Sequence, residues 1–264
     1  MIPGLPRRIL AGLAALLLLV APSAPAAIAS PFADWTAVFV AGDWRANNGA
    51  PTEAFDNARR DAAAAFQRAG FSAQNISQFS VRPARYPAAR PLASTPSAID
   101  AALRAQASRA TGGCLVYFTS HGDPRGLQLG ERILTPRQMA VMIDRSCAKR
   151  PTVVIVSACF SGVFLPALAA PHRLVLTAAR ADRSSFGCTE SDQYPFFDAC
   201  LLETLPIASD FADLGRRARG CVDRRERAEG LTPASEPQMQ IGAGLQPLLP
   251  LQTFTAVPPK VAKP

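Results

Sequence analysis

Two side chains able to do covalent chemistry follow apolar runs in the middle of the chain. His121 comes directly after the run at 113–120, and Cys159 comes two residues after the run at 151–157. A thiol is strongly nucleophilic, and a histidine can take up its proton and later protonate a leaving amine. If the two runs are neighbouring strands, their ends lie about 4.8 Å apart. This spacing predicts a Cys159–His121 dyad for acyl transfer, with the peptide N–H groups of Gly122 and Cys159 as oxyanion donors.

Structural interpretations compete with the catalytic one. A cysteine that ends an apolar strand is usually a packed core residue, and a histidine before glycine is compatible with an ordinary turn. The second histidine, His172, opens another apolar run and is a poor catalytic candidate. The chain has no G-x-G-x-x-G, G-K-[ST] or G-x-S-x-G motif, so nucleotide binding and serine hydrolysis are not supported. We expect neither a metal nor a cofactor, because the chemistry needs none and the two histidines stand far apart.

The segments that would position the dyad alternate between strand and helix. Apolar, β-rich runs predict strands at 35–41, 72–81, 113–120, 151–157 and 173–177, with a sixth strand at 238–241. Helices are expected to begin near Thr52, Thr95 and Thr135, residues 126–134 suggest a hairpin, and 195–228 are mostly helical with breaks at Pro206 and Gly215. This order predicts an α/β fold with a mostly parallel sheet of about six strands, covered on both faces. Ligands bind such sheets at the carboxyl ends of the strands, where His121 and Cys159 stand.

The N-terminus predicts export. Arg7 and Arg8 precede an apolar run at 9–21, and 27–29 match an A-x-A cleavage site, as in a secretory signal peptide. We expect cleavage after Ala29, with retention as a membrane anchor as the alternative. The protein would then be periplasmic or secreted, touching a membrane only before cleavage. The Ala- and Arg-rich composition suggests a bacterium. Residues 30–242 would form one domain, and 243–264 a loose, Pro-rich tail.

Composition limits the partners. Hydrophobic residues make up 48% of the 264, enough for a sizeable core, and only 3 Tyr and 2 Trp offer rings on which bases could stack. We expect no nucleic-acid partner. Six arginines between 216 and 227 contribute much of the net charge of +8, and they read either as a solvated helix face or as contact with an anionic envelope surface.

Export also bears on the six cysteines, because most thiols pair in an oxidising compartment. Cys114 and Cys147 each stand near the start of a neighbouring predicted strand, so a disulfide between them is geometrically plausible. The remaining cysteines cannot be apportioned from the sequence; they are Cys188, Cys200 and Cys221. Cys159 is expected to be free.

Five ordered stretches resemble one protein family. Residues 118–122 (FTSHG) and 154–162 (VIVSACFSG) are similar to the strands ending in His-Gly and Ala-Cys of the legumain-like cysteine peptidases, whose clan also holds the caspases. Further similarity lies at 38–42 and 67–71, 176–188 and 234–242. The resemblance implies a caspase-like three-layer α/β/α sandwich and a cysteine endopeptidase that acts on peptides or proteins through a thioester. Cys159 would be its nucleophile, His121 its general acid and base, and Ser184 and Ser185 the border of its specificity pocket.

Two departures concern the specificity pocket. Legumain has a glutamate two residues before the nucleophile, where this chain has Ser157, and its pocket arginine falls on Ala54. Arg45 and Asn57 are the nearest polar substitutes, so Ser157 and Arg45 join the candidate substrate-binding residues. Two other functions stay open: a transpeptidase that passes the acyl group to an amine, and a non-catalytic envelope binding protein on the same scaffold.

Overall fold

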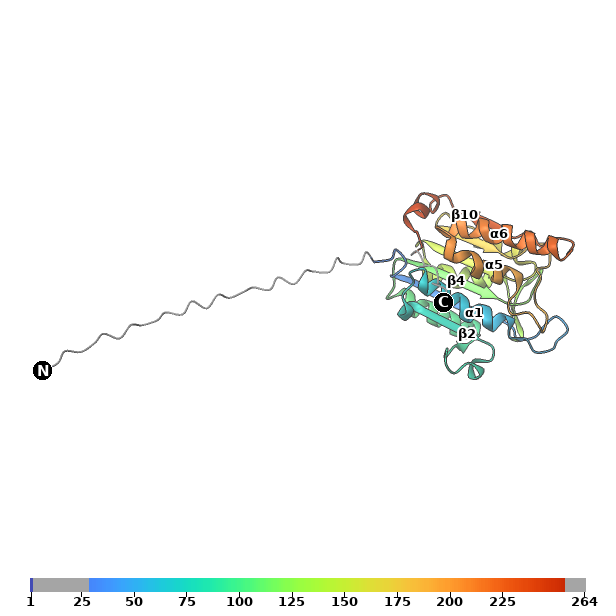
Figure 1. The fold of residues 1–264 in the computed structure, drawn as a ribbon, viewed down its shortest axis with the longest axis horizontal. Coiled ribbons are helices and arrows are strands. Elements are labelled where there is room, and N and C mark those ends of the chain that lie inside the picture. Colours follow the sequence, from blue (N-terminus) through green and yellow to red (C-terminus); the bar gives the residue numbers. More distant parts are fainter. Residues whose placement is uncertain (2–28, 255–264) are drawn as a thin grey trace.

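A twisted seven-stranded sheet forms the centre of the computed structural model, which describes Met1 and residues 29–254. Apart from its two ends, the predicted signal peptide at 1–29 lies outside the described residues. The strand order is β10-β9-β8-β4-β1-β2-β3, with β10 antiparallel to β9 and the other pairs parallel (Figure 1). The strands span β1 (Trp35–Ala41), β2 (Ile76–Ser80), β3 (Leu92–Ala93), β4 (Gly113–Thr119), β8 (Thr152–Ser157), β9 (Arg173–Thr177) and β10 (Gln238–Ile241).

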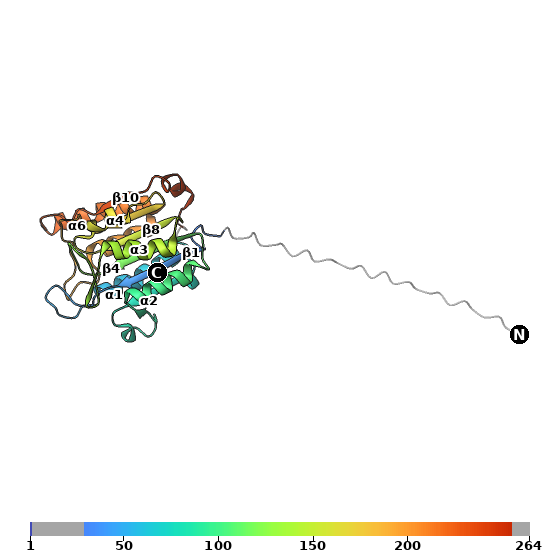
Figure 2. The ribbon, with the colours of Figure 1, turned by 180° about the vertical axis from the view of Figure 1, so that it is seen from behind.

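Helices cover both faces of this sheet. One face carries α1 (Ala54–Arg68), α5 (Phe196–Thr204) and α6 (Phe211–Ala228), and the other carries α2 (Pro96–Ala107), α3 (Pro136–Cys147) and the short α4 (Leu165–Leu168) (Figures 1 and 2). A small antiparallel sheet follows β4 and consists of β5 (Gly122–Asp123), β6 (Gly126–Leu129) and β7 (Arg132–Leu134). The predicted α/β architecture is confirmed. Within the described residues, no helix is both long and apolar enough to span a membrane.

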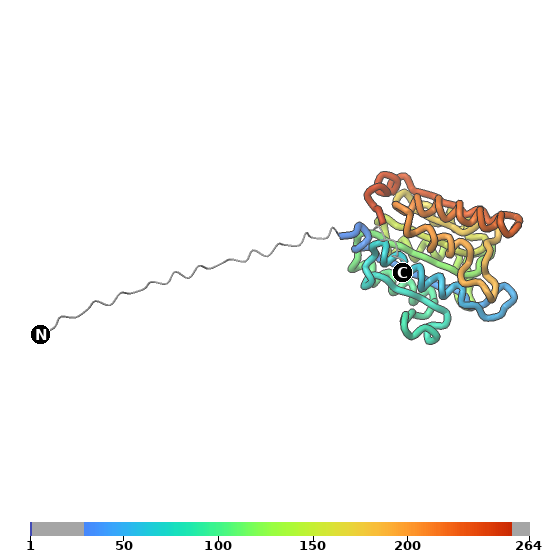
Figure 3. Tube along the Cα trace, viewed as in Figure 1, coloured from blue at the N-terminus to red at the C-terminus, as the bar shows by residue number. Residues whose placement is uncertain are grey.

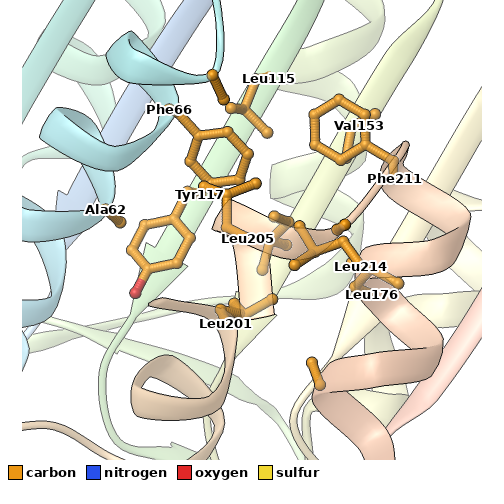
Figure 4. Packing of buried hydrophobic residues seen from close by; sticks show 14 of the residues in the cluster. Ala62, Phe66, Leu115, Tyr117, Val153, Leu176, Leu201, Leu205, Phe211 and Leu214 are labelled. Atoms are coloured by element: carbon orange, nitrogen blue, oxygen red, sulfur yellow. The ribbon is translucent and has the colours of Figure 1, made fainter. Parts of the chain in front are cut away.

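The central strands are apolar on both faces because each face packs against helices. In β1, Ala37 and Phe39 join the core beneath α1, α5 and α6, while Val38 and Val40 join the core beneath α2 and α3. Figure 4 shows the first of these cores, where Phe66 and Phe211 from the helices meet strand residues such as Leu115 and Val153.

Helix ends follow the sequence signals in two cases and depart from them in two. The side chains of Thr95 and Thr135 accept N–H groups of the first turn of α2 and α3, as expected of N-caps. The first helix begins at Ala54 with Glu53 as its N-cap residue, rather than Thr52. α6 continues through Gly215, since this glycine lets the helix approach the sheet: a Cβ there would lie 2.7 Å from Leu176 Cδ2.

Three further segments differ from the expectations. The sheet has seven strands rather than about six, because β3 has only two residues and shows no periodicity. The second strand starts at Ile76 instead of 72, since Ala73–Asn75 form a 3₁₀ turn. The stretch expected to be a loose tail packs on the core as far as it is described: Leu245 and Leu249 are buried around a 3₁₀ helix at Gln246–Leu251.

One disulfide joins the sheet to a helix, and a second joins two helices of the same layer. The predicted bond between Cys114 and Cys147 joins β4 to the end of α3, and Cys200–Cys221 joins α5 to α6. Cys159 and Cys188 remain as thiols. Each bond therefore ties together two elements on one side of the sheet.

Replacing both Cys114 and Cys147 by Ala should lower the free energy of unfolding by about 2–4 kcal/mol, because the bond closes a long loop in the unfolded chain. Urea denaturation monitored by circular dichroism measures this loss. As a control on the pairing, alkylation in denaturant should modify two cysteines without reductant and all six after reduction. Four or more reactive thiols before reduction would contradict the pairing.

Candidate active site

Equivalent positions beyond two paired strands hold His121 and Cys159. β4 and β8 pair in parallel with Thr119 opposite Ser157, and each catalytic candidate stands two residues further along. Beyond the strands the two backbones touch: a Cβ added to Gly122 would lie 2.3 Å from the carbonyl oxygen of Cys159. Only glycine fits this contact without a shift. The structure thus brings His121, Gly122 and Cys159 together at the carboxyl edge of the sheet.

A backbone carbonyl fixes the imidazole of His121. Nε2 lies 2.8 Å from the carbonyl oxygen of Arg45, and the Phe55 ring packs edge-on against the imidazole with a centroid distance of 5.0 Å. A carbonyl oxygen only accepts hydrogen bonds, so Nε2 carries the hydrogen of the neutral ring. Nδ1 is then the ring atom that can take up a proton.

The Cys159 thiol is half-buried beneath the segment that follows β9. The peptide N–H of Ser185 donates to Sγ at 3.2 Å, and the Ser185 hydroxyl oxygen lies 3.5 Å from Sγ. The next residue, Phe160, has φ of 57°, a left-handed conformation that is uncommon outside glycine. No acceptor among the described residues takes the N–H of Cys159, so this donor is available to a substrate oxygen.

The guanidinium of Arg45 is already engaged in ion pairs. It lies 3.1 Å from Asp43 Oδ1 and 3.3 Å from Glu131 Oε1, and these carboxylates raise its pKa. Among the described residues, Arg45 contacts the dyad with its backbone carbonyl oxygen and not with its guanidinium. The other polar substitute, Asn57, donates from Nδ2 to the carbonyl oxygen of Gln193 at 3.3 Å.

The two predicted pocket serines are placed differently. Ser185 touches the thiol, whereas Ser184 is exposed beside it. The loop carrying them is tied to the loop after β1 by hydrogen bonds from Asn47 N–H to the Cys188 carbonyl (3.1 Å) and from Asn48 to Glu190 (2.6 Å). In Figure 3 these loops lie on the side of the molecule away from the described chain ends. They form a wall next to the dyad.

A buried carboxyl under the site is absent from the sequence prediction. Asp198 of α5 is 1% exposed and accepts hydrogen bonds from Tyr117 Oη (2.5 Å) and Thr119 Oγ1 (2.7 Å). Burial raises the pKa of Asp198 to about 6, against the lowering effect of hydrogen bonds from Thr119, Tyr117 and Ser157. Ser157 itself is 2% exposed. Through these hydrogen bonds the buried carboxyl of Asp198 links α5 to β4 and β8 beneath the site.

The second thiol, Cys188, is packed between Ala41 and Phe55 and is 4% exposed. Burial raises its pKa well above the ordinary value, and the neighbouring Cys159 adds to this rise. Cys188 thus stays protonated, in a place where substrate does not reach its sulfur. Within the described part of the chain, no group of three or more His, Cys, Asp or Glu side chains is arranged to hold a metal ion.

Comparison with known proteins adds to this geometry. Residues 90–213, which include both His121 and Cys159, match the model of the Peptidase C13 family. Among solved structures, the crystal structure of caspase-1 from Spodoptera frugiperda is similar with a TM-score of 0.58, covering 84% of this chain and 93% of that chain at 13% identity. At this identity the likeness shows the fold alone, and it confirms the caspase-like three-layer sandwich. The comparison with curated proteins finds no significant match.

Replacing Asp198 by Asn should change how stability depends on pH. Because burial raises the pKa of Asp198 to about 6, the folded protein holds this proton more tightly than the unfolded chain. That stabilisation is complete below about pH 4 and is lost as the pH rises through 6. The free energy of unfolding of the variant, relative to wild type, should therefore rise by about 2.4 kcal/mol between pH 4 and pH 7. Urea titrations at both pH values measure it, and a difference independent of pH would contradict the buried charge.

Proposed function

We propose that this cysteine-type peptidase, whose residues 90–213 match the Peptidase C13 family, cleaves peptide bonds within protein chains by a thioester mechanism. Cys159 is the nucleophile and His121 the general acid and base. The observation that carries this proposal is the hydrogen bond between His121 Nε2 and the Arg45 carbonyl. It leaves Nδ1 as the proton acceptor of a histidine that lies in register with the thiol.

In the first step, Sγ attacks the carbonyl carbon of the scissile bond while Nδ1 of His121 takes the thiol proton. The substrate oxygen gains a negative charge, which the N–H groups of Gly122 and Cys159 stabilise. The tetrahedral intermediate then collapses. The C–N bond breaks, and His121 gives its proton to the leaving amine, so that the first product departs and a thioester remains.

Water completes the cycle. His121 takes a proton from the attacking water, the C–S bond breaks, and the thiol recovers its proton as the carboxylic product leaves. Phe55 and the Arg45 carbonyl are positioning groups in both halves, because they hold the imidazole while its protonation changes. The Cys159 N–H is preorganised for the oxyanion, since it has no acceptor among the described residues.

Ser184 and Ser185 are proposed to line the subsite for the residue before the scissile bond. Of the other two candidates, Ser157 is buried and the guanidinium of Arg45 is held in ion pairs. The Ser185 contact with Sγ supports a place for this segment at the reacting atom. Asp198 lies beneath Ser157, where its buried carboxyl supports the site from below without reaching a substrate. The paired guanidinium of Arg45 offers less charge to a substrate than a free arginine would.

We also propose that the protein acts outside the cytoplasm, in the periplasm or as a secreted enzyme. Its two disulfides support this location, because such bonds persist in oxidising compartments and are rare in the cytosol. The signal-peptide pattern in the sequence supports it independently.

A peptidyl acyloxymethyl ketone, which alkylates activated thiols, should add one label to the wild-type protein, read by intact mass. Cys159→Ala should take no label. His121→Ala should react at least about 100-fold more slowly, because the thiol loses its base.

Cys188→Ala is the matched control: it removes the other free thiol and should label as wild type does. Labelling of wild type no faster than of Cys159→Ala would contradict an activated nucleophile and favour a binding protein. Product analysis of a cleaved peptide with and without an added amine then separates hydrolysis from acyl transfer to the amine.

A further inference from the structure

Two adjoining cavities lie beside the small β5–β7 sheet that follows His121. The first, about 450 Å³, lies between the loop at 94–97 and the β6–β7 turn at 129–132. The second, about 370 Å³, lies between α2 and α3, the helices seen side by side in Figure 2. Pro96 and Ser97 line both. The cavities therefore adjoin, and together they are called here the α2–α3 channel.

The upper end of the channel is connected to His121 in two ways. The N–H of Gln128, next to the channel residue Leu129, donates to the His121 carbonyl at 2.9 Å. Glu131 of the turn pairs with Arg45, whose carbonyl oxygen holds the imidazole. In contrast, Ser185 of the proposed subsite contacts Cys159 from the segment after β9. The channel thus begins on the histidine side of the dyad.

The proposed role of His121 determines which part of a substrate lies on the histidine side of the dyad. His121 gives its proton to the leaving amine, so the chain that follows the scissile bond must run past the imidazole. An extended peptide advances about 3.3 Å per residue. A substrate with several residues beyond the bond can therefore extend along this side of the protein.

The charges that line the channel are unbalanced. Arg132 in the first cavity and Arg137 and Arg145 in the second are exposed, and none of them is within ion-pair distance of a carboxylate among the described residues. The two acidic residues that line the channel already have partners in ion pairs. Asp100 pairs with Arg104 at 2.8 Å, and Glu131 pairs with Arg45 at 3.3 Å. The channel therefore presents cationic charge that has no partner within the described protein.

Apolar surface accompanies this charge. Leu134, Val141 and Met142 line the second cavity, and Val141 is 39% exposed. A polypeptide that carries carboxylates along its length can use both features, with its carboxylates on the arginines and its aliphatic groups on the floor.

We propose that the α2–α3 channel binds the part of a protein substrate that follows the scissile bond and favours acidic residues there. This inference rests on the proposed function, since it takes the direction of the substrate from the role of His121. It names a class of substrate, namely chains with Asp or Glu downstream of the cleaved bond.

Cleavage of matched peptides tests this preference. A mixed peptide library first supplies one sequence that the protein cleaves, and its residues before the scissile bond are kept. Three quenched peptides then differ only in the six residues that follow the bond, which are all Ser, alternating Asp and Ser, or alternating Lys and Ser. We expect kcat/KM for the Asp peptide to exceed that for the Ser peptide about three- to tenfold at low ionic strength, with the Lys peptide slowest. The preference should shrink in 0.5 M NaCl, because salt screens exposed charges.

Variants locate the effect. Arg132→Glu together with Arg137→Glu should remove or reverse the preference for Asp, whereas Arg132→Lys with Arg137→Lys, which keeps the charge, should retain it. Arg224→Glu is the matched control, because it makes the same change on the exposed surface of α6 on the opposite face of the sheet, and it should leave the ratio unchanged. Equal rates on Asp and Ser peptides in wild type, or a preference that survives the double Glu change, would overturn the inference.

A short substrate separates the two proposals. The same residues before the bond, joined to aminomethylcoumarin, end at the leaving group and report on the dyad without the channel. Cleavage of this substrate without any preference among the three peptides refutes the channel and leaves the proposed function standing. If wild type cleaves neither this substrate nor any peptide of the library, both proposals fail.

Discussion

The parallel pairing of β4 with β8 is the constraint on which the rest of the site depends. Backbone hydrogen bonds set Thr119 opposite Ser157, and this register places His121 and Cys159 at the same height beyond the sheet. A shift of one residue would turn every side chain of one strand to the opposite face. It would bury the thiol or the imidazole in the wrong layer, so the apolar residues that fix the register also fix the catalytic geometry.

Main-chain atoms make many of the contacts that position the dyad. A carbonyl orients the imidazole, a peptide N–H donates to the thiol, and a glycine allows two loops to touch. Main-chain groups of this kind can be supplied by many side-chain sequences. Ser157 and Ala54 can therefore depart from the legumain pattern while the proposed dyad stays in place.

The sequence predicts most of the fold because its strands are long, apolar and separated by helices with clear caps such as Thr95 and Thr135. It predicts less where structure comes from tertiary contact. Leu92–Ala93 is too short to show periodicity. The apolar residues Leu245 and Leu249, which lie among the prolines after 243, become buried only because they pack on the core of the folded protein. Likewise, the dyad follows from strand ends, whereas Asp198 lies far along the chain. A single acid in the apolar stretch 196–200 is the signal that could have indicated it. The free Cys188 and the Cys200–Cys221 bond depend on distances that spacing does not encode.

A cluster of phenylalanines holds the two ends of the described polypeptide close together. Phe32, before β1, packs against Phe254 with tilted rings and a centroid distance of 5.4 Å, and both pack against Phe211. The described polypeptide thus enters and leaves at the amino edge of the sheet (Figure 3), whereas the thiol stands at the carboxyl edge, roughly 20 Å away by the length of a strand. A tether, surface or fusion partner joined at either point would attach to the amino edge of the sheet. The carboxyl edge, which carries the thiol, would then face away from the attachment.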